Sequence, residues 1–369
     1  MKSNPKPEAR ADLAALEIYV ASGPELVGDF IDLSQNESPF GPSPAAVDAV
    51  QNIAGSLNRY PEVSGAALRE ALARRYGLDQ DRIVCGSASD ELIALLVLAY
   101  AAPGGEVLFP QCSFIYYRMA AIACGAVPVA APQRENRVDV DALLERAGER
   151  TRICFIDNPC NPTGTYLSAA EIRRLREGLP PHVLLVIDAA YSEYVTVADY
   201  SNGVDLVEER QDTVMLRTLS KMHGLAGLRI GWAYCPADVA ETLHQVRSPY
   251  NIGSAAIAAG VAAVGDVEHV ARNLAHNSRW LARLQSEFST LGLKPVPSIA
   301  NFVLVEFPQS GSHTAAAAAA FLKDSGILVR PVAGFGFPHH LRITIGTDEQ
   351  MERLLGCLRS WIGEKGLRA

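Results

Sequence analysis

Short apolar runs alternate with longer stretches of mixed polarity through the middle of the chain. The apolar runs predict strands over residues 107–109, 126–130, 152–156, 183–187 and 213–217. The stretches between them predict helices, at residues 114–124, 139–147 and 168–177. Because buried strands that alternate with helices form a mostly parallel sheet covered on both faces, this part of the chain predicts an α/β fold.

Capping residues mark several of the helix ends. Ser43-Pro44 has the order of an N-cap followed by proline at the first helical position. Another helix is predicted over residues 64–76 and ends at Gly77, as is typical of a C-terminal glycine. Ser168 and Glu171 have the spacing of a capping box, which places the start of a helix there.

The pattern changes at both ends of the chain. Prolines break up residues 1–40, which we interpret as an extended arm. After about residue 250, helices are predicted at 267–291 and 314–325, a further helix at the end, and strands at 301–306, 327–330 and 341–345. This order predicts a smaller α+β domain. We therefore expect an arm with part of the small domain at 1–45, a large domain at 46–255 and the small domain at 256–369.

Composition narrows the class of protein. The 369 residues are 49% hydrophobic and 20% charged, which is typical of a globular protein of about two domains. The net charge of −8 argues against a nucleic-acid partner, because phosphate backbones require a basic surface. The seven cysteines form no CxxC pair, so we expect free thiols and no metal site. Without a long apolar run or a signal-peptide pattern, the sequence predicts a cytoplasmic protein with no membrane partner.

Polar residues follow three of the predicted strands. They lie in the segments 157–164, 188–191 and 218–221. In a parallel sheet, ligands bind beyond the carboxyl ends of the strands. We therefore expect four side chains from these segments to converge: Asn161, Asp188, Tyr191 and Lys221.

Each of these residues has a chemical interpretation and a structural alternative. Lys221 is one of six lysines and lies among small and apolar residues, so it is a candidate Schiff-base former or a surface lysine. Asp188 could pair with the protonated ring nitrogen of pyridoxal phosphate, or it could cap a turn. Asn161 and Tyr191 could donate hydrogen bonds to the cofactor's phenolic oxygen, or they could be a turn residue and a core aromatic residue.

A phosphate site is also predicted. The segment 86–90 (GSASD) opens an apolar helix, and backbone N–H groups at a helix start bind phosphate. The alternative is ordinary capping by Ser89 or Asp90. Ser220 and Arg229 could add phosphate contacts, and Phe114 could stack on a cofactor ring or belong to the core.

Together these segments resemble the fold-type I pyridoxal-phosphate aminotransferases. Residues 220–231 (SKMHGLAGLRIG) are similar to that family's cofactor-lysine signature, and the resemblance extends from Leu33 to about Gly346. It implies a large domain with a mostly parallel seven-stranded sheet between helices, a smaller α+β domain, pyridoxal 5'-phosphate as cofactor and a homodimer. Four segments are also similar to the histidinol-phosphate aminotransferase family: residues 33–44, 59–61, 89–91 and 341–347.

The resemblance assigns roles to individual residues. Lys221 would hold the cofactor and move protons, Asp188 would pair with the ring nitrogen, and Asn161 and Tyr191 would contact the phenolic oxygen. The implied phosphate and ring contacts are Ala88, Ser89, Asp90, Phe114, Ser220 and Arg229. Tyr60 would reach the cofactor of the neighbouring subunit. The implied substrate-binding residues are Tyr19, Asn36, Arg330 and Arg342, the arginines because a guanidinium suits carboxylate and phosphate alike.

The implied reaction moves an amino group between L-histidinol phosphate and 2-oxoglutarate, giving imidazole acetol phosphate and L-glutamate in histidine biosynthesis. An aromatic amino-acid aminotransferase on the same fold is the alternative. A related lyase and a cofactor-binding transcription regulator are weaker alternatives. Four residues near the expected site depart from the family pattern: Cys112, Asp157, Cys160 and His223.

Overall fold

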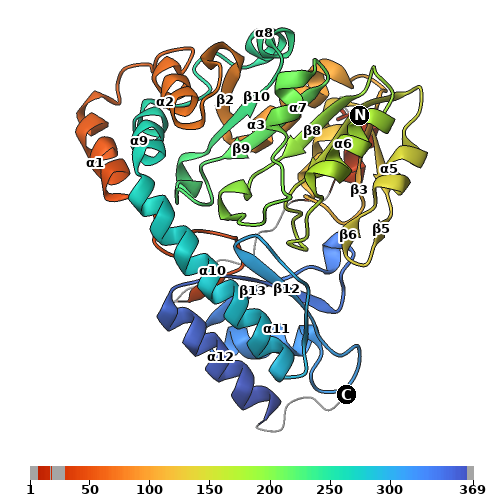
Figure 1. Cartoon of the computed structure of the whole chain (residues 1–369), viewed down its shortest axis with the longest axis vertical. Coiled ribbons are helices and arrows are strands. Elements are labelled where there is room, and N and C mark those ends of the chain that lie inside the picture. Colours follow the sequence, from red (N-terminus) through yellow and green to blue (C-terminus); the bar gives the residue numbers. More distant parts are fainter. Residues whose placement is uncertain (1–6, 17, 19–29, 364–369) are drawn as a thin grey trace, which may run out of the picture.

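The computed structural model describes residues 7–16, 18 and 30–363. In this part of the chain, helices pack against two large β-sheets (Figure 1). One sheet has seven strands in the order β2-β10-β9-β8-β7-β3-β4. Their bounds are β2 Ile83–Ser87, β10 Ile230–Tyr234, β9 Thr213–Thr218, β8 Leu184–Asp188, β7 Thr151–Asp157, β3 Glu106–Pro110 and β4 Val127–Ala131. Strand β10 is antiparallel to both of its neighbours, and the other pairs are parallel. The expected mostly parallel seven-stranded sheet is confirmed.

Both faces of the central strands of this sheet are buried, as their continuous apolar sequences predict. On β7, Ile153 and Phe155 belong to one core cluster, and the alternating Cys154 and Ile156 belong to another. The first cluster includes residues of α3 (Ala88–Tyr100), α4 (Tyr116–Cys124) and α8 (Ala237–Val246). The second includes residues of α5 (Val140–Arg146), α6 (Ala169–Gly178) and α7 (Val204–Glu209). Helices α1 (Pro44–Ile53), α2 (Ala66–Tyr76) and α9 (Ser254–Gly265) pack together beside β2 and β10.

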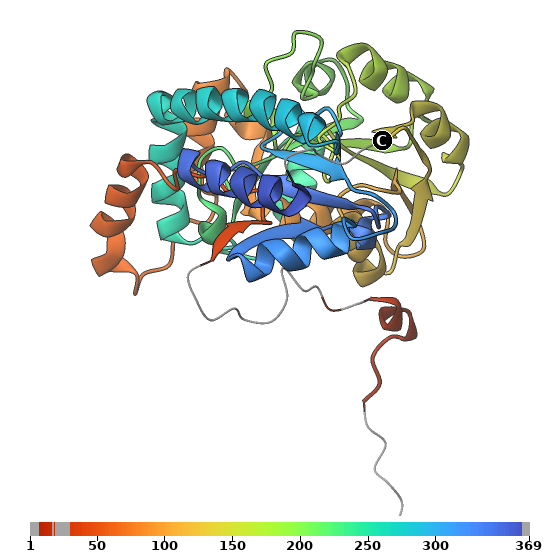
Figure 2. The same cartoon turned by 90° about the horizontal axis from the view of Figure 1, so that it is seen from below.

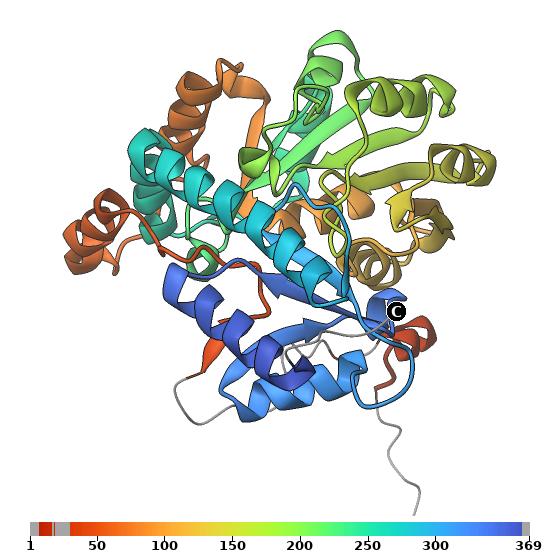
Figure 3. The same cartoon turned by 60° about the horizontal axis from the view of Figure 1, so that its bottom comes forward.

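The second sheet has five strands in the order β1-β13-β14-β12-β11. Their bounds are β1 Ile31–Leu33, β13 Ile327–Pro331, β14 His340–Thr344, β12 Phe302–Glu306 and β11 Lys294–Pro295. Helices α10 (Val267–Thr290), α11 (Ala315–Asp324) and α12 (Asp348–Ile362) share one core cluster with this sheet. Figures 2 and 3 show β1, from the N-terminal part of the chain, beside the C-terminal strands; it pairs in parallel with β13.

Alternation along β14 turns an arginine away from this core. Leu341 and Ile343 belong to the cluster with α10, α11 and α12, and Arg342 lies between them. Because successive side chains of a strand point to opposite faces, Arg342 faces away from the three helices. Arg330 is its register partner on β13. The small sheet therefore presents both arginines on the face that its helices leave uncovered.

Several elements differ from the sequence-based expectation. Residues 1–40 are not a simple arm, because a 3₁₀ helix (Ala11–Ala15) and strand β1 interrupt them. The apolar helix after residue 86 begins at Ala88, and Gly86 and Ser87 instead end strand β2. Strands β2 and β10 and helices α7, α8 and α9 were not predicted. The domain boundaries remain a prediction.

Helix α10 connects the two sheets (Figure 1). It follows α9 after a bend of 72°. No single helix in the described ranges is long and apolar enough to cross a membrane, although α9 and α10 meet that criterion as a bent pair, by length and composition only. The apolar surface of α9 packs on α1 and α2, which accounts for its composition.

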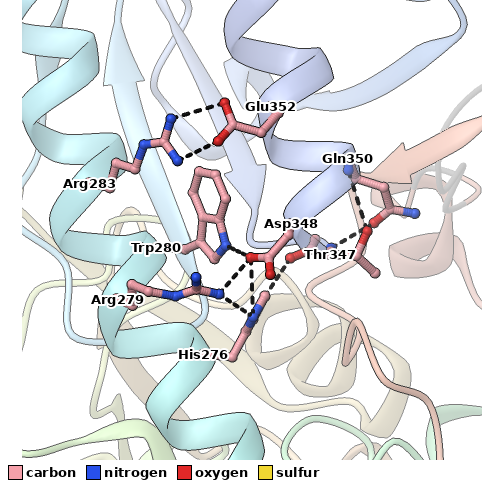
Figure 4. Close-up of polar contacts among 9 residues, drawn as sticks. His276, Arg279, Trp280, Arg283, Thr347, Asp348, Gln350 and Glu352 are labelled. Atoms are coloured by element: carbon pink, nitrogen blue, oxygen red, sulfur yellow. Dashed lines mark hydrogen bonds and ion pairs between the residues drawn. The ribbon is translucent and has the colours of Figure 1, made fainter.

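Polar contacts tie the start of α12 to α10 (Figure 4). Asp348 accepts hydrogen bonds from the Trp280 indole and from Arg279 Nη2, and Arg283 forms a two-pronged ion pair with Glu352. Thr347 caps the helix. Since residue 347 follows β14 by only three positions, these contacts also fix the end of the strand that carries Arg342.

The cap at Thr347 should contribute to stability. Thr347 Oγ1 accepts the Gln350 N–H at 3.3 Å, and Gln350 Oε1 accepts the Thr347 N–H at 3.0 Å. We expect Thr347→Ala to lower the free energy of unfolding by about 1 kcal/mol, because one cap acceptor is lost. Urea denaturation measures this, with Thr347→Ser as the control that keeps the hydroxyl. An equal loss in both variants would contradict the capping role.

Candidate active site

A cavity of about 390 Å³ lies at the carboxyl ends of β7, β8 and β9, between the large sheet and the two arginines of the small sheet. It brings together most of the site residues predicted from the sequence. These are Asn36, Ala88, Ser89, Asp90, Phe114, Asn161, Asp188, Tyr191, Ser220, Lys221, Arg229, Arg330 and Arg342. The convergence expected from the strand-end rule is therefore observed.

Lys221 extends from the loop after β9 into the cavity. Its Nζ donates a hydrogen bond to Gln35 O at 3.1 Å. Desolvation, followed by the positive charge of Arg342, lowers the pKa of Lys221 from 10.5 to about 8. At Gly224 this loop packs directly against the backbone of Gly41, because a Cβ atom on Gly224 would lie 2.1 Å from Gly41 O. A lysine in this state is a competent nucleophile near neutral pH.

Asp188 is the last residue of β8 and is buried. Its Oδ2 accepts a hydrogen bond from the Tyr117 hydroxyl at 3.1 Å, and its Oδ1 accepts the Ala190 N–H at 3.2 Å. Burial raises the pKa of Asp188 to about 7. A carboxylate this poorly solvated is stabilised by a cation in the cavity, such as a protonated ring nitrogen.

The start of α3 lines one part of the cavity. Ala88 has a positive φ of 64°, and α3 approaches β10 so closely that a Cβ atom on Gly231 would lie 2.4 Å from Ser89 N. Nearby, the buried Ser220 hydroxyl has no hydrogen-bond partner among the described residues. Arg229 pairs with Asp90, with Nη2 and Oδ2 2.8 Å apart. A helix N-terminus, an unpaired hydroxyl and a guanidinium together fit a phosphate.

A network of polar side chains connects the two sheets across the cavity. Arg342 Nη1 donates to Asn161 Oδ1 and Nη2 donates to Ser34 O at 2.6 Å. Asn36 Nδ2 donates to the Tyr191 hydroxyl at 2.9 Å. In this arrangement the oxygens of Asn161 and Tyr191 act as acceptors. The donors that would reach a phenolic oxygen are the Asn161 amide nitrogen and the Tyr191 O–H.

Two predicted residues do not belong to the cavity as described. Tyr60 is 82% exposed and stacks on Tyr250, with the ring centroids 4.6 Å apart. Its contact with a neighbouring subunit stays a prediction, because a single chain does not test it. Tyr19 lies outside the described residues.

The cavity also contains residues that the sequence argument missed or treated only as departures. Further lining residues are Gln35, Glu37, Ile115, Asp157, Ala190, Thr218, Ala226, Gly227 and Phe335. Of the four departures from the family pattern, Asp157 lines this cavity, and Cys112, Cys160 and His223 are not among its described lining residues. A signal for Asp157 was present, because it ends an apolar strand just as Asp188 does. The missed residue Tyr117, three positions after Phe114, donates its hydroxyl hydrogen bond to Asp188.

Comparisons with known proteins agree with this geometry. The family model described as "Aminotransferase class I and II" matches residues 28–358. The histidinol-phosphate aminotransferase of Paramagnetospirillum magneticum is 47% identical over 97% of this chain and 99% of its own length. That of Rhodospirillum centenum is 51% identical over 89% of this chain and 91% of its own length.

Solved structures share the fold. The histidinol-phosphate aminotransferase of Sinorhizobium meliloti, crystallised with pyridoxal 5'-phosphate, aligns with a TM-score of 0.86 at 25% identity, over 96% of this chain and 99% of that chain. A mutant of the Thermus thermophilus aspartate aminotransferase aligns with a TM-score of 0.81 at 20% identity, over 96% and 99%, and shows the fold alone. The fold-type I architecture expected from the sequence is thereby confirmed. The chain belongs to the class I and II aminotransferases and, within them, to the histidinol-phosphate aminotransferase family.

Proposed function

We propose that this chain transfers an amino group between L-histidinol phosphate and 2-oxoglutarate, with pyridoxal 5'-phosphate as its cofactor. The observation that carries the proposal is one cavity holding a desolvated lysine, a buried carboxyl group, an anion-binding helix start and two arginines. The relatives over most of the chain length carry the same activity in their names.

The residues present fit the cofactor. Ala88, Ser89, Ser220 and Arg229 would hold its phosphate, and Phe114 would lie against its ring. Asp188 would stabilise a protonated ring nitrogen, for which the buried carboxyl group is suited. When bound, pyridoxal 5'-phosphate supplies an aldehyde that joins to amines and a ring that withdraws electrons from them.

The reaction also requires a group that carries protons. The lowered pKa of Lys221 keeps part of its amine neutral near pH 7, so Nζ can attack as a nucleophile and later accept and return a proton. Arg342 would bind the phosphate or carboxylate of the substrate, and Arg330 and Asn36 would assist. A planar guanidinium binds either anion in two-pronged fashion, so one pocket can serve both substrates in turn.

The proposal extends to assembly and location. We propose a cytoplasmic homodimer in which Tyr60 contacts the neighbouring subunit's cofactor. In support, Tyr60 is largely exposed, and Leu57 and Val63 of the same segment are also exposed. Such apolar exposure is typical of a surface that binds another protein.

The substrate assignment is tested in the half-reaction. Enzyme loaded with pyridoxal phosphate is mixed with low L-histidinol phosphate or with low L-phenylalanine, and the change in cofactor absorbance is followed. We expect conversion about 100-fold faster with histidinol phosphate, or about 2.7 kcal/mol of discrimination. Lys221→Ala, checked for folding by circular dichroism, should show no turnover. Equal or faster conversion of phenylalanine would identify an aromatic amino-acid aminotransferase instead.

Cofactor uptake should depend on pH through Lys221. Only the neutral amine attacks an aldehyde, and with a pKa of about 8 half of it is neutral at that pH and most of it one pH unit higher. We expect the uptake rate of the apoenzyme to rise between about pH 6 and about pH 9 and then to level off. N-α-acetyl-lysine is the control, and its rate should still be rising at about pH 10. A continuing rise for the enzyme would contradict the lowered pKa.

Close packing at Gly231 should be necessary for phosphate binding. A methyl group there would displace the backbone of Ala88 and Ser89. We expect Gly231→Ala to weaken pyridoxal-phosphate binding by tenfold or more, about 1.4 kcal/mol. Gly253→Ala is the matched control, because a Cβ atom there meets nothing within 4 Å. Equilibrium dialysis measures the affinities of both variants, and equal affinities would contradict a role for Gly231 in phosphate binding.

A further inference from the structure

A second carboxyl group lies beside Asp188 in the cavity. Asp157 ends β7 as Asp188 ends β8, and the two residues are register partners on these parallel strands. Each is 4% exposed, and each lines the cavity. Register partners on neighbouring strands point to the same face of a sheet, so the two carboxyl groups share one poorly solvated region.

Asp157 accepts hydrogen bonds from the backbone of two segments that line the cavity. Its Oδ2 accepts the Asn161 N–H at 2.8 Å and the Phe114 N–H at 3.2 Å. Asn161 belongs to the loop after β7, and Phe114 to the segment that leads into α4. One carboxyl oxygen therefore fixes two separate segments, each of which brings a side chain to the proposed cofactor.

The other oxygen of Asp157 has a different environment. Oδ1 is buried and forms no hydrogen bond with any described residue. Titratable groups around Asp157 are Asp188 on β8, Tyr117 on α4, Tyr191 after β8 and Cys160 in its own loop. None of them is a cation. Apart from the backbone N–H groups, only the Cys160 thiol favours the charged form of Asp157, and burial outweighs that hydrogen bond.

Two adjacent carboxylates at such a position titrate as a pair. Burial, with the neighbouring Asp188 adding to it, raises the pKa of Asp157 to about 7, and burial raises the pKa of Asp188 likewise. Like charges in one low-dielectric site cannot both form without a large cost, so the pair retains a proton. The bare Oδ1 of Asp157 can hold that proton without loss of either backbone hydrogen bond.

We propose that Asp157 is a positioning residue that stays uncharged in the loaded enzyme, holding Asn161 and Phe114 in place while Asp188 alone carries the negative charge. The proposal rests on the proposed function, because it assigns Asp188 to the cofactor's ring nitrogen. It adds to the proposed function a statement of which carboxyl group is charged and which residues the uncharged one orients.

Two substitutions separate charge from orientation. Asp157→Asn keeps an oxygen acceptor for both N–H groups and cannot carry a charge, whereas Asp157→Ala removes the acceptor. We expect the apoenzyme of D157N to bind pyridoxal 5'-phosphate within about threefold of wild type, and D157A to bind at least tenfold more weakly. Equilibrium dialysis gives the affinities, and urea denaturation of each apoenzyme checks the fold.

A spectroscopic titration tests the charge directly. If Asp157 is uncharged in the loaded enzyme, D157N and wild type should share the pH midpoint of the cofactor's visible absorbance within about 0.3 units. A charged Asp157 would stabilise a cation on the cofactor, so its loss in D157N would shift that midpoint by about a unit. This comparison needs only wild type and D157N, so it stands even where D157A does not fold.

The outcomes distinguish the two proposals. Two results would overturn the role of Asp157 and leave the proposed function standing, provided that wild type binds the cofactor. One is a D157N affinity as low as that of D157A, and the other is a midpoint shift of about a unit in D157N. Failure of wild type to bind pyridoxal 5'-phosphate would overturn the proposed function, and the inference with it.

Discussion

Desolvation at the carboxyl edge of the large sheet is the constraint on which the site depends. Strands β7, β8 and β9 are buried on both faces, so the residues that end them are removed from water. The same effect acts in opposite directions on acids and bases: it raises the pKa of Asp188 and lowers that of Lys221. Burial in the core is thus the largest cause of both shifts, and the charges of Arg342 and Asp90 add to it.

The site is completed only where the two sheets meet. Arg342 comes from the small sheet and donates to Asn161 at the edge of the large one. Asn36, just after β1, similarly joins Tyr191 of the large sheet to Thr344 of the small one. The contacts between α10 and the start of α12 lie immediately behind β14 (Figure 4). The position of Arg342 is therefore set by the packing of the C-terminal helices as well as by its own strand.

The sequence predicted those parts of the site that follow from a local rule. Asn161, Asp188 and Lys221 come after apolar strands, and parallel strands place their carboxyl ends together. The contact of Gly231 with Ser89 joins segments far apart in the chain, so periodicity could not reveal it. Strand β1 has only three residues, too few for an alternating pattern, and becomes a strand by pairing with β13. Tyr60 depends on a second chain, so neither the sequence pattern nor one chain decides its role.

The pKa values of Lys221, Asp157 and Asp188 lie within a narrow range. Lys221 titrates near 8 and the two carboxyl groups near 7, so about 1.4 kcal/mol per pH unit separates one arrangement of protons from another. Binding of a charged ligand supplies energy of that size, since a charge-assisted hydrogen bond contributes about as much. A ligand can therefore redistribute the protons when it enters, without any large movement of the chain. Fully solvated groups at their ordinary pKa values would be several units apart and would not respond in this way. In the role proposed for Lys221, this close matching of pKa values would let its amine give up and regain a proton within one catalytic cycle.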